Sequence, residues 1–309
     1  MVTGVARYDK FQASYREPVR RDESLAAYTT FRTGGPADLY IEVASTMTLA
    51  EAIRLAEELA IPYFVIGEGS NLLVSDDGYR GLIIRNQIMG LAVEGRELVT
   101  GAGERLDRAV DYATEHALTG LEFAAGIWGT VGGAVCGNAG AFGSQISSVL
   151  GVAELVDRQG NVRIEPQAYF EFAYRHSRLK QTGETVSRSW FCLEAGSGID
   201  IARRTEEIRL SRCQKHPVQP CSAGCFFRNI EVADQPNGKL SAGKLLDEVG
   251  AKRLRVGAAA VLDRHANILI NAGGASSRDI RQLADILKAR VKERFNVDLK
   301  EEVICLGNF

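Results

Sequence analysis

The sequence has few cysteines and histidines, and neither type is grouped. Its six cysteines lie at positions 136, 192, 213, 221, 225 and 305, and no two of them form a Cys-x-x-Cys pair. The four histidines, at positions 116, 176, 216 and 265, are equally dispersed. This scatter argues against a disulfide framework and against the paired ligands of a zinc site. We therefore expect no metal centre.

Long apolar runs and an excess of one charge are also missing. No window approaches the roughly 18 apolar residues of a membrane span, and the N-terminus lacks the apolar core of a secretion signal. The 37 basic and 39 acidic residues give a formal net charge of -2, which provides no basic field for nucleic acid or an anionic membrane. We expect a cytoplasmic protein that binds neither, and no feature indicates an obligate protein partner.

Glycine is the residue that stands out, in two short runs. Residues 126–143 contain seven glycines and no charged side chain, and residues 65–74 contain Gly67-Glu68-Gly69-Ser70-Asn71. Glycine packs nothing and costs conformational entropy, so such density is kept where backbone must approach something closely. Successive N–H groups without side chains form an anion site. The two runs predict two backbone cradles for one phosphate-bearing ligand.

The surrounding pattern is that of a mixed α and β protein of 309 residues, long enough for two or three domains. The first glycine run follows a predicted strand, residues 63–66, but it is neither a Walker loop nor a Gly-x-Gly-x-x-Gly fingerprint. Apolar periodicity and capping residues predict further elements. These are a helix from Ser45 or Thr46, a helix with Leu106, Val110, Ala113 and Ala117 on one face, strands at 152–156, 189–193 and 266–271, and a helix capped by Ser276 with Asp279.

Six segments, in this order, resemble the UDP-N-acetylenolpyruvoylglucosamine reductase family (MurB), flavoenzymes of peptidoglycan precursor synthesis. Each segment alone is a weak signal, but the six together are specific and span nearly the whole chain. They are Thr30–Ala37, Gly67–Leu73, Gly126–Gly143, Tyr174–Ser177, Ala223–Asn229 and Leu299–Val303.

The resemblance implies an α+β fold with three parts. Residues 1–86 and 87–200 would be two subdomains of an FAD-binding domain of the vanillyl-alcohol oxidase (PCMH) type, and residues 201–309 would bind the UDP-sugar. The separation of Arg175 from Cys225 is that of the shorter family variant, which lacks a tyrosine-bearing loop over the substrate. We therefore assign no tyrosine to catalysis.

The resemblance also implies NADPH-dependent reduction of UDP-N-acetylglucosamine enolpyruvate to UDP-N-acetylmuramate through noncovalent FAD, with NADPH as co-substrate. Tyr174, Lys215 and Asn229 would then contact substrate. The FAD-binding residues would be Gly67, Glu68, Gly69, Ser70, Asn71, Gly129, Thr130, Gly132, Gly133, Ala134 and Asn138.

Three residues acquire catalytic roles from the same resemblance. Cys225 stands where the family usually has the proton-donating serine of Gly-Ser-Phe-Phe-Lys-Asn-Pro. A thiol gives up a proton more readily than a hydroxyl, because its unperturbed pKa is about 8.5. Arg175 would bind the substrate carboxylate, and Glu302, held protonated, would donate a hydrogen bond to it as charge accumulates.

Several residues depart from the family pattern. Trp128, Gly137, Arg228 and Ile230 differ from the residues that are usual at these positions, and the first two could alter the flavin pocket. Two alternatives also stay open: an FAD oxidase of the same superfamily acting on an alcohol or sugar, and a catalytically idle nucleotide-binding protein. The joint presence of Arg175, a proton donor at 225 and Glu302 argues against the idle protein.

Overall fold

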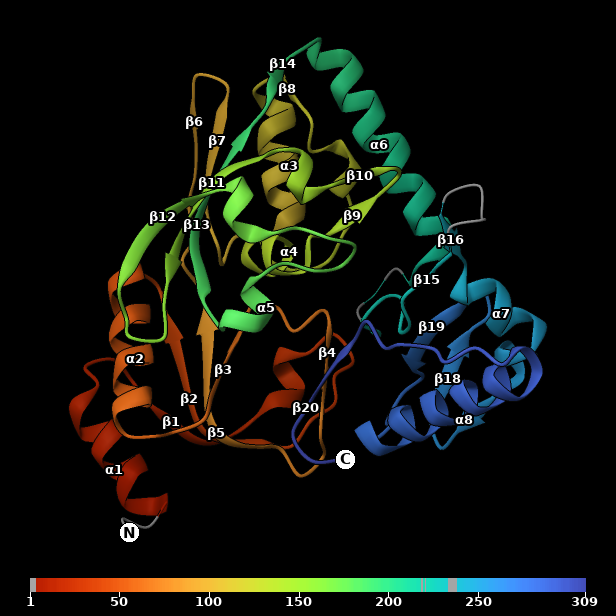
Figure 1. Cartoon of the computed structure of the whole chain (residues 1–309), viewed down its shortest axis with the longest axis horizontal. Helices are drawn as coiled ribbons and strands as arrows, with labels where there is room; N and C mark the ends of the chain where they lie inside the picture. The colour runs from red at the N-terminus through yellow and green to blue at the C-terminus, as the bar shows by residue number, and fades with distance from the viewer. Residues whose placement is uncertain (1–3, 218, 220, 233–237) are drawn as a thin grey trace. The chain divides into compact units, whose positions relative to one another are not determined.

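The computed structural model describes residues 4–217, 219, 221–232 and 238–309, and the chain divides into two compact units (Figure 1). The first unit comprises the residues up to Glu23, Ala37–Glu68 and Arg80–Ser211. The second comprises Ser24–Pro36, Gly69–Tyr79 and Arg212–Phe309. The chain thus enters the second unit three times, and the boundaries at residues 86 and 200 stay a prediction.

A four-stranded sheet and two helices build one part of the first unit. The strand order is β1 (Arg20–Ser24), β2 (Pro36–Val43), β5 (Tyr79–Asn86), β3 (Tyr63–Ile66), with β3 parallel to β5. Helix α2 (Thr46–Glu58) begins at a capping box between Ser45 and Thr48, and α1 (Gly4–Ser14) precedes β1. Leu49 and Ile53 of α2 join Ile41 and Ile84 of the sheet in one core, which is the amphipathic packing that the helix pattern predicts.

A five-stranded antiparallel sheet builds the rest of the first unit. Helices α3 (Leu106–Glu115) and α4 (Val131–Gly137) pack against it and share its core (Figure 1). The strand order is β12 (Val162–Pro166), β11 (Leu150–Val156), β13 (Thr185–Cys192), β7 (Glu97–Gly101), β6 (Leu91–Glu94). Shorter elements are β8 (Leu118–Thr119) with β14 (Glu194–Ala195), β9 (Gly140–Ala141) with β10 (Ser144–Gln145), and α5 (Leu179–Thr182).

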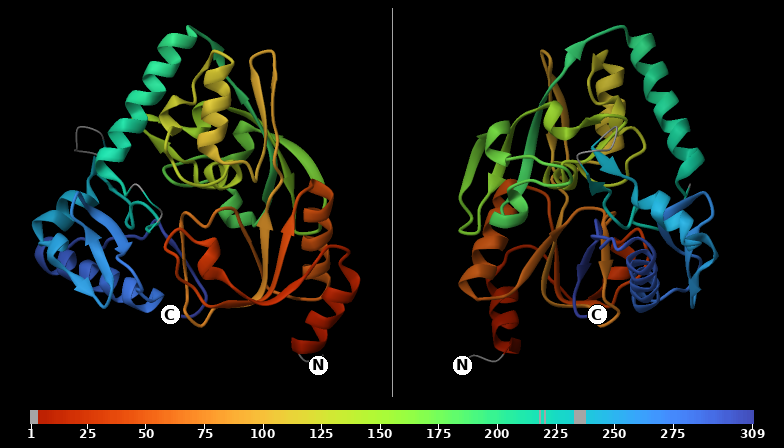
Figure 2. Two further views of the ribbon diagram at one scale, coloured as in Figure 1. Left: turned by 180° about the vertical axis from the view of Figure 1, so that it is seen from behind. Right: turned by 45° about the vertical axis from the view of Figure 1, so that its right-hand side comes forward.

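The second unit is built on the three-stranded sheet β17 (Arg255–Val256), β18 (Ala259–Leu262) and β19 (His265–Asn271). Helices α7 (Ala242–Glu248) and α8 (Ser277–Phe295) pack against this sheet and against each other (Figure 2). Phe31, from the N-terminal part of the chain, is fully buried in the same core. The remaining strands are β15 (Ile230–Glu231) with β16 (Lys239–Leu240), and β20 (Ile304–Leu306) parallel to β4 (Leu72–Val74).

Helix α6 (Gly198–Lys215) carries the chain from the first unit to the second, because the division falls between Ser211 and Arg212. In the part of the chain that the structure describes, no helix is long and apolar enough to cross a membrane. The predicted elements near 46, 63, 106, 152, 189, 266 and 277 are all present.

Candidate active site

The two glycine runs meet within the first unit at Gly67, directly after β3. A Cβ added at Gly67 would overlap the Oγ1 of Thr130 and lie 2.7 Å from its Cγ2. Arg105 strengthens the same junction, since its backbone bridges Thr130 and its guanidinium lies 3.1 Å from the Glu68 carboxylate. The structure therefore brings together Gly67, Glu68 and Thr130, which the sequence predicts as parts of one cradle.

The second glycine run forms a short helix with a bare face. Thr130 caps α4, and its Oγ1 accepts a hydrogen bond from the Gly133 N–H at 3.4 Å. A Cβ at Gly133 would meet only Thr130 Oγ1, at 3.6 Å, and a Cβ at Gly137 would meet nothing within 4 Å. Residues four apart lie on one helix face, so this side of α4 leaves backbone open to a bound group. The assignment of residues 129–134 to an FAD cradle stays a prediction.

The rest of the first glycine run belongs to the second unit and is held there by backbone contacts. Gly69 has φ +59°, and a Cβ on it would overlap the Tyr28 carbonyl oxygen. Its own carbonyl accepts the Thr30 N–H at 3.4 Å. Asn71 donates its side-chain amide to the Glu302 carbonyl at 3.1 Å. A predicted cofactor-binding residue and a predicted catalytic residue are thus directly joined.

Cys225 and Glu302 lie on neighbouring extended segments of the second unit. Cys225, half-buried after Gly224 with φ +73°, forms a backbone bridge with Ile268 of β19. On its other side the Glu302 N–H donates to the Phe226 carbonyl at 2.8 Å. The segment that contains Cys225 therefore runs between β19 and the Glu302 segment, and the structure brings these two predicted catalytic residues together.

Asn267 fixes this segment from the β19 side, and sequence reasoning missed it. Its Oδ1 accepts the Phe227 N–H at 3.0 Å, and its Nδ2 donates to the Phe227 carbonyl at 2.8 Å. The side chain is buried, so these bonds satisfy backbone groups that water does not reach. The available signal was an amide in the otherwise apolar run of residues 266–270.

Arg175 and Tyr174 lie in a turn of the first unit. Arg175 has φ +53°, and its guanidinium lies 5.6 Å from the centre of the Tyr174 ring. Asn138, fully buried at the end of α4, donates its side-chain amide to the carbonyl of Ala173, next to this turn. Arg175 belongs to the first unit, whereas Cys225 and Glu302 belong to the second.

Comparison with known proteins identifies the family. Residues 216–306 match the family described as UDP-N-acetylenolpyruvoylglucosamine reductase, C-terminal domain, and residues 37–164 match an FAD binding domain. The UDP-N-acetylenolpyruvoylglucosamine reductase of Caldanaerobacter subterraneus subsp. tengcongensis is 36% identical over 287 residues, 93% of each chain. That of Heliobacterium modesticaldum is 37% identical over 296 residues, 95% of this chain and 92% of its own. This chain belongs to the UDP-N-acetylenolpyruvoylglucosamine reductase family.

Solved structures agree with this assignment. The UDP-N-acetylenolpyruvylglucosamine reductase (MurB) of Thermus caldophilus is 34% identical and has a TM-score of 0.79. The match covers 94% of this chain and 99% of the Thermus chain. A variant of Phl p 4 described as a glucose oxidase has a TM-score of 0.51 at 12% identity and shares the fold alone. The predicted α+β fold with an FAD-binding domain is confirmed. The chain is an FAD-containing oxidoreductase with NADPH as co-substrate.

Two predicted substrate-binding residues of this reductase lie at helix ends in the second unit. Lys215 is exposed and is the last residue of α6. Asn229 is half-buried, and its Oδ1 accepts the N–H of Ala242, the first residue of α7, at 3.1 Å. The Oδ1 of Asn229 thus orders the start of α7.

His216 follows Lys215 and lies in a positively charged surrounding. Burial, together with the neighbouring positive charges, lowers its pKa from the ordinary 6.5 to about 4. The imidazole of His265 is 6.0 Å away, centre to centre, and the Arg264 guanidinium donates to the His216 carbonyl at 3.1 Å. The groups that act on the His216 pKa are Arg212, His265, Lys215 and Arg264.

We expect this neutral histidine to make the reductase sensitive to mild acid. Unfolded His216 takes up a proton near pH 6.5, whereas folded His216 does so only near pH 4, so the free energy of unfolding decreases as the pH falls through this window. Urea unfolding at pH 7, 6 and 5 measures the effect. A His216→Asn variant should lose part of this pH dependence, and a slope identical to that of the parent would contradict the assignment.

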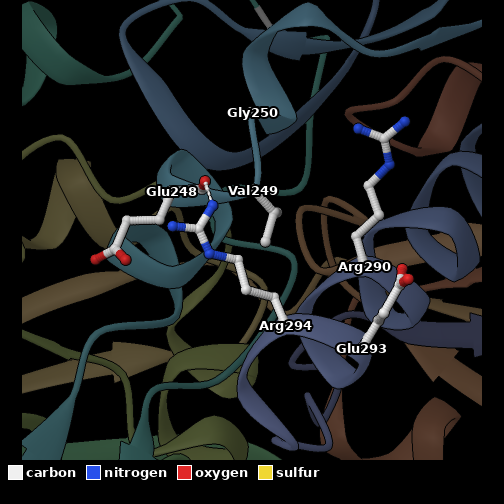
Figure 3. A pocket seen from close by; sticks show the side chains of 6 residues that line it. All are labelled: Glu248, Val249, Gly250, Arg290, Glu293 and Arg294. Atoms are coloured by element: carbon white, nitrogen blue, oxygen red, sulfur yellow. Dashed lines mark hydrogen bonds between the residues drawn. The ribbon is translucent and has the colours of Figure 1, made fainter.

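A separate depression of about 450 Å³ lies between the ends of α7 and α8, and Figure 3 shows its side chains. Arg294 reaches across it and donates to the Glu248 carbonyl at 2.6 Å. A cation at the last carbonyls of a helix is a capping contact. None of the residues that line this depression is a predicted site residue. They are Glu248, Val249, Gly250, Arg290, Glu293 and Arg294.

Proposed function

We propose that this protein reduces UDP-N-acetylglucosamine enolpyruvate to UDP-N-acetylmuramate in the cytoplasm, as a step of peptidoglycan precursor synthesis that serves cell shape and division. Apart from family membership, one structural observation supports this reaction. The second unit holds a thiol, Cys225, and a carboxyl group, Glu302, on neighbouring extended segments joined by the hydrogen bond from Glu302 N–H to the Phe226 carbonyl. These are a proton donor and a group that stabilises charge on the substrate.

The FAD cradle is proposed to be Gly67–Asn71 together with Gly129–Ala134. When bound there, FAD would supply the hydride for reduction of the enolpyruvyl group, with NADPH as the source of that hydride. Gly67 lets the end of β3 pack against Thr130, and the lack of a side chain at Gly133 and Gly137 leaves room beside α4 for a bound group. No residue of the chain needs to bond covalently to the flavin.

The protein side chains would stabilise negative charge on the substrate and donate a proton to it. Addition of hydride to the outer carbon leaves negative charge that is delocalised into the adjacent carboxylate. Arg175 would bind that carboxylate through two N–H groups, and Glu302 would donate a hydrogen bond to it. Cys225 would then give its proton to the carbon next to the carboxylate. Tyr174, Lys215 and Asn229 would bind the rest of the substrate.

Glu302→Gln tests whether Glu302 acts in the reduction of the substrate and not in the reduction of the flavin by NADPH. The work of Glu302 begins only when charge appears on the substrate, so we expect oxidation of the reduced flavin by enolpyruvyl substrate to slow by about 100- to 1,000-fold. Reduction of the flavin by NADPH should change little. Stopped-flow absorbance at the flavin band measures the two half-reactions separately.

Glu301→Gln is the matched control for this substitution. Glu301 is the adjacent carboxylate, and it forms ion pairs with Arg281 and Lys288, each at 3.0 Å. Its loss should lower stability while leaving both half-reactions close to those of the parent. The role of Glu302 would be wrong if Glu302→Gln slowed the two half-reactions equally. A purified protein without flavin absorption, or one that consumed no NADPH with the enolpyruvyl substrate, would overturn the proposed function as a whole.

A further inference from the structure

We propose that Asn138 is a positioning residue for Arg175, acting from the end of α4, rather than a direct contact of the cofactor. The inference rests on the proposed role of Arg175 in binding the substrate carboxylate. It deepens that role, because it identifies what holds the arginine turn in place within the first unit.

Both the nitrogen and the oxygen of the Asn138 side-chain amide form hydrogen bonds within the protein. Asn138 ends α4 in the left-handed conformation, with φ 44° and ψ 57°, and its side chain is fully buried. Its Nδ2 donates to the Ala173 carbonyl at 3.0 Å, and its Oδ1 accepts the Ser147 N–H at 3.0 Å. The carbonyl of Ala173 is separated from Arg175 only by Tyr174. An amide that is buried and engaged in this way is a structural tie between segments.

A second buried bond ties the other side of the same turn to α4. Ser177, also fully buried, donates its hydroxyl to the Cys136 carbonyl at 2.7 Å. The backbones of Ala173 and His176 exchange hydrogen bonds in both directions at 3.1 Å, which closes the turn. The last residues of α4 therefore hold the turn on both sides of Tyr174 and Arg175.

The backbone of Arg175 is in a strained conformation, with φ +53°, that the surrounding contacts must hold in place. A non-glycine residue with positive φ is strained by its own Cβ, and such a conformation persists where the surroundings determine it. The Arg175 carbonyl also accepts a hydrogen bond from Lys180 Nζ at 2.8 Å, which is a third side-chain bond that holds this turn. Loss of one tie would let the guanidinium direction vary.

Helix α4 also links this turn to the FAD cradle. Its first turn is capped by Thr130, which contacts Gly67, and its end holds the Arg175 turn through Asn138 and Cys136. Cradle and arginine are thus fixed to one rigid element of the first unit. A substrate carboxylate that must lie in register with the flavin would profit from this common support, because a misplacement of about 1 Å can cost on the order of 100-fold in rate.

The test is Asn138→Gly in the FAD-loaded enzyme. Glycine accepts the left-handed conformation without strain, so the change removes the two side-chain hydrogen bonds and leaves the helix end possible. We expect oxidation of reduced flavin by the enolpyruvyl substrate to slow by about 10- to 100-fold, with NADPH-dependent flavin reduction and FAD content unchanged. Asn138→Asp, which keeps the acceptor for Ser147 but loses the donor to Ala173, should act in the same direction.

Asn296→Gly is the matched control, because Asn296 also ends a helix, α8, in the left-handed conformation with φ 55° and ψ 32°, but it is exposed. It should leave both half-reactions unchanged. In an Arg175→Ala background, Asn138→Gly should cause no further loss, since the group that it positions is gone. Additive losses, or a loss of FAD from Asn138→Gly and Asn138→Asp alike, would overturn the positioning role. If Arg175→Ala itself left substrate reduction unchanged, the proposed role of Arg175 would be the part that fails.

Discussion

Replacing Cys225 by alanine is expected to slow reduction of the enolpyruvyl substrate by about 100- to 10,000-fold, the usual range for general acid catalysis. The variant would still accept electrons from NADPH, because the thiol acts only after hydride has reached the substrate. Cys225→Ser is expected to retain substantial activity, since it introduces the donor that is usual in the family. Stopped-flow measurement of each half-reaction, with circular dichroism to verify folding, checks both variants.

Chemical modification gives a second line of evidence on Cys225. Iodoacetamide is expected to inactivate the parent enzyme, and bound substrate is expected to protect it. The Cys225→Ser variant is the control, because it keeps the other five cysteines and should resist inactivation. An alanine variant that reduced the substrate at the parental rate would remove Cys225 from the mechanism and assign the proton to water or to another side chain.

Gly67→Ala is expected to abolish FAD retention. The new Cβ would overlap Thr130 Oγ1 and lie 2.7 Å from Thr130 Cγ2, so the strand end and the start of α4 must separate and the cradle must open. The flavin-to-protein absorbance ratio after gel filtration measures the loss. Gly198→Ala, where the added Cβ would lie 3.7 Å from that of Ala117, is a matched control in the same unit and should keep its FAD.

A second substitution separates this clash from general unfolding. Glycine caps a helix nearly as well as threonine, so Thr130→Gly removes both clashing atoms at little cost to α4. The double variant Gly67→Ala with Thr130→Gly should therefore regain FAD at least in part. Full occupancy in Gly67→Ala alone would place the cofactor elsewhere. Gly69 is a poorer test position, because its positive φ and its contact with the Tyr28 carbonyl would couple any change to backbone strain.

Elements with their own capping residues and an apolar face were predictable from the sequence. Helix α8 has the predicted capping box between Ser276 and Asp279, and Ile280, Leu283 and Leu287 are buried as the 3.6-residue period requires. Helix α2 follows the same logic from Ser45. In both, local propensity and tertiary burial favour the same structure, so a reading of the pattern succeeds.

Elements that contradict local propensity were not predictable. The sequence of residues 131–137, with three glycines, does not favour a helix, yet it forms α4 because the Thr130 cap and the surrounding core select that conformation. Helix α6 was not predicted because few of its 18 residues are buried, so its sequence shows no apolar face. Tertiary contacts decide both cases, and a single sequence does not contain them.

The site shows the same limit at the level of single residues. Motifs identified Arg175, Cys225 and Glu302, and the structure places the last two on neighbouring segments. The motifs did not indicate that Asn267 ties the Cys225 segment to β19. They also did not indicate that the Asn138 amide donates a hydrogen bond to the Ala173 carbonyl. Such roles depend on which distant backbone group lies opposite an amide, which spacing along the chain does not specify.

The pairing of β20 with β4 has a consequence for how the chain is made. Residues 304–306 lie parallel to residues 72–74, and the Ser75 hydroxyl contacts the carbonyl of Asn308, one residue before the end of the sequence. Contacts of such separation form late and slowly. During synthesis, the segment after Gly69 therefore waits for its partner strand until residues 304–306 have been made and have left the ribosome. Until then the unpaired strand at residues 72–74 needs protection from other exposed strands.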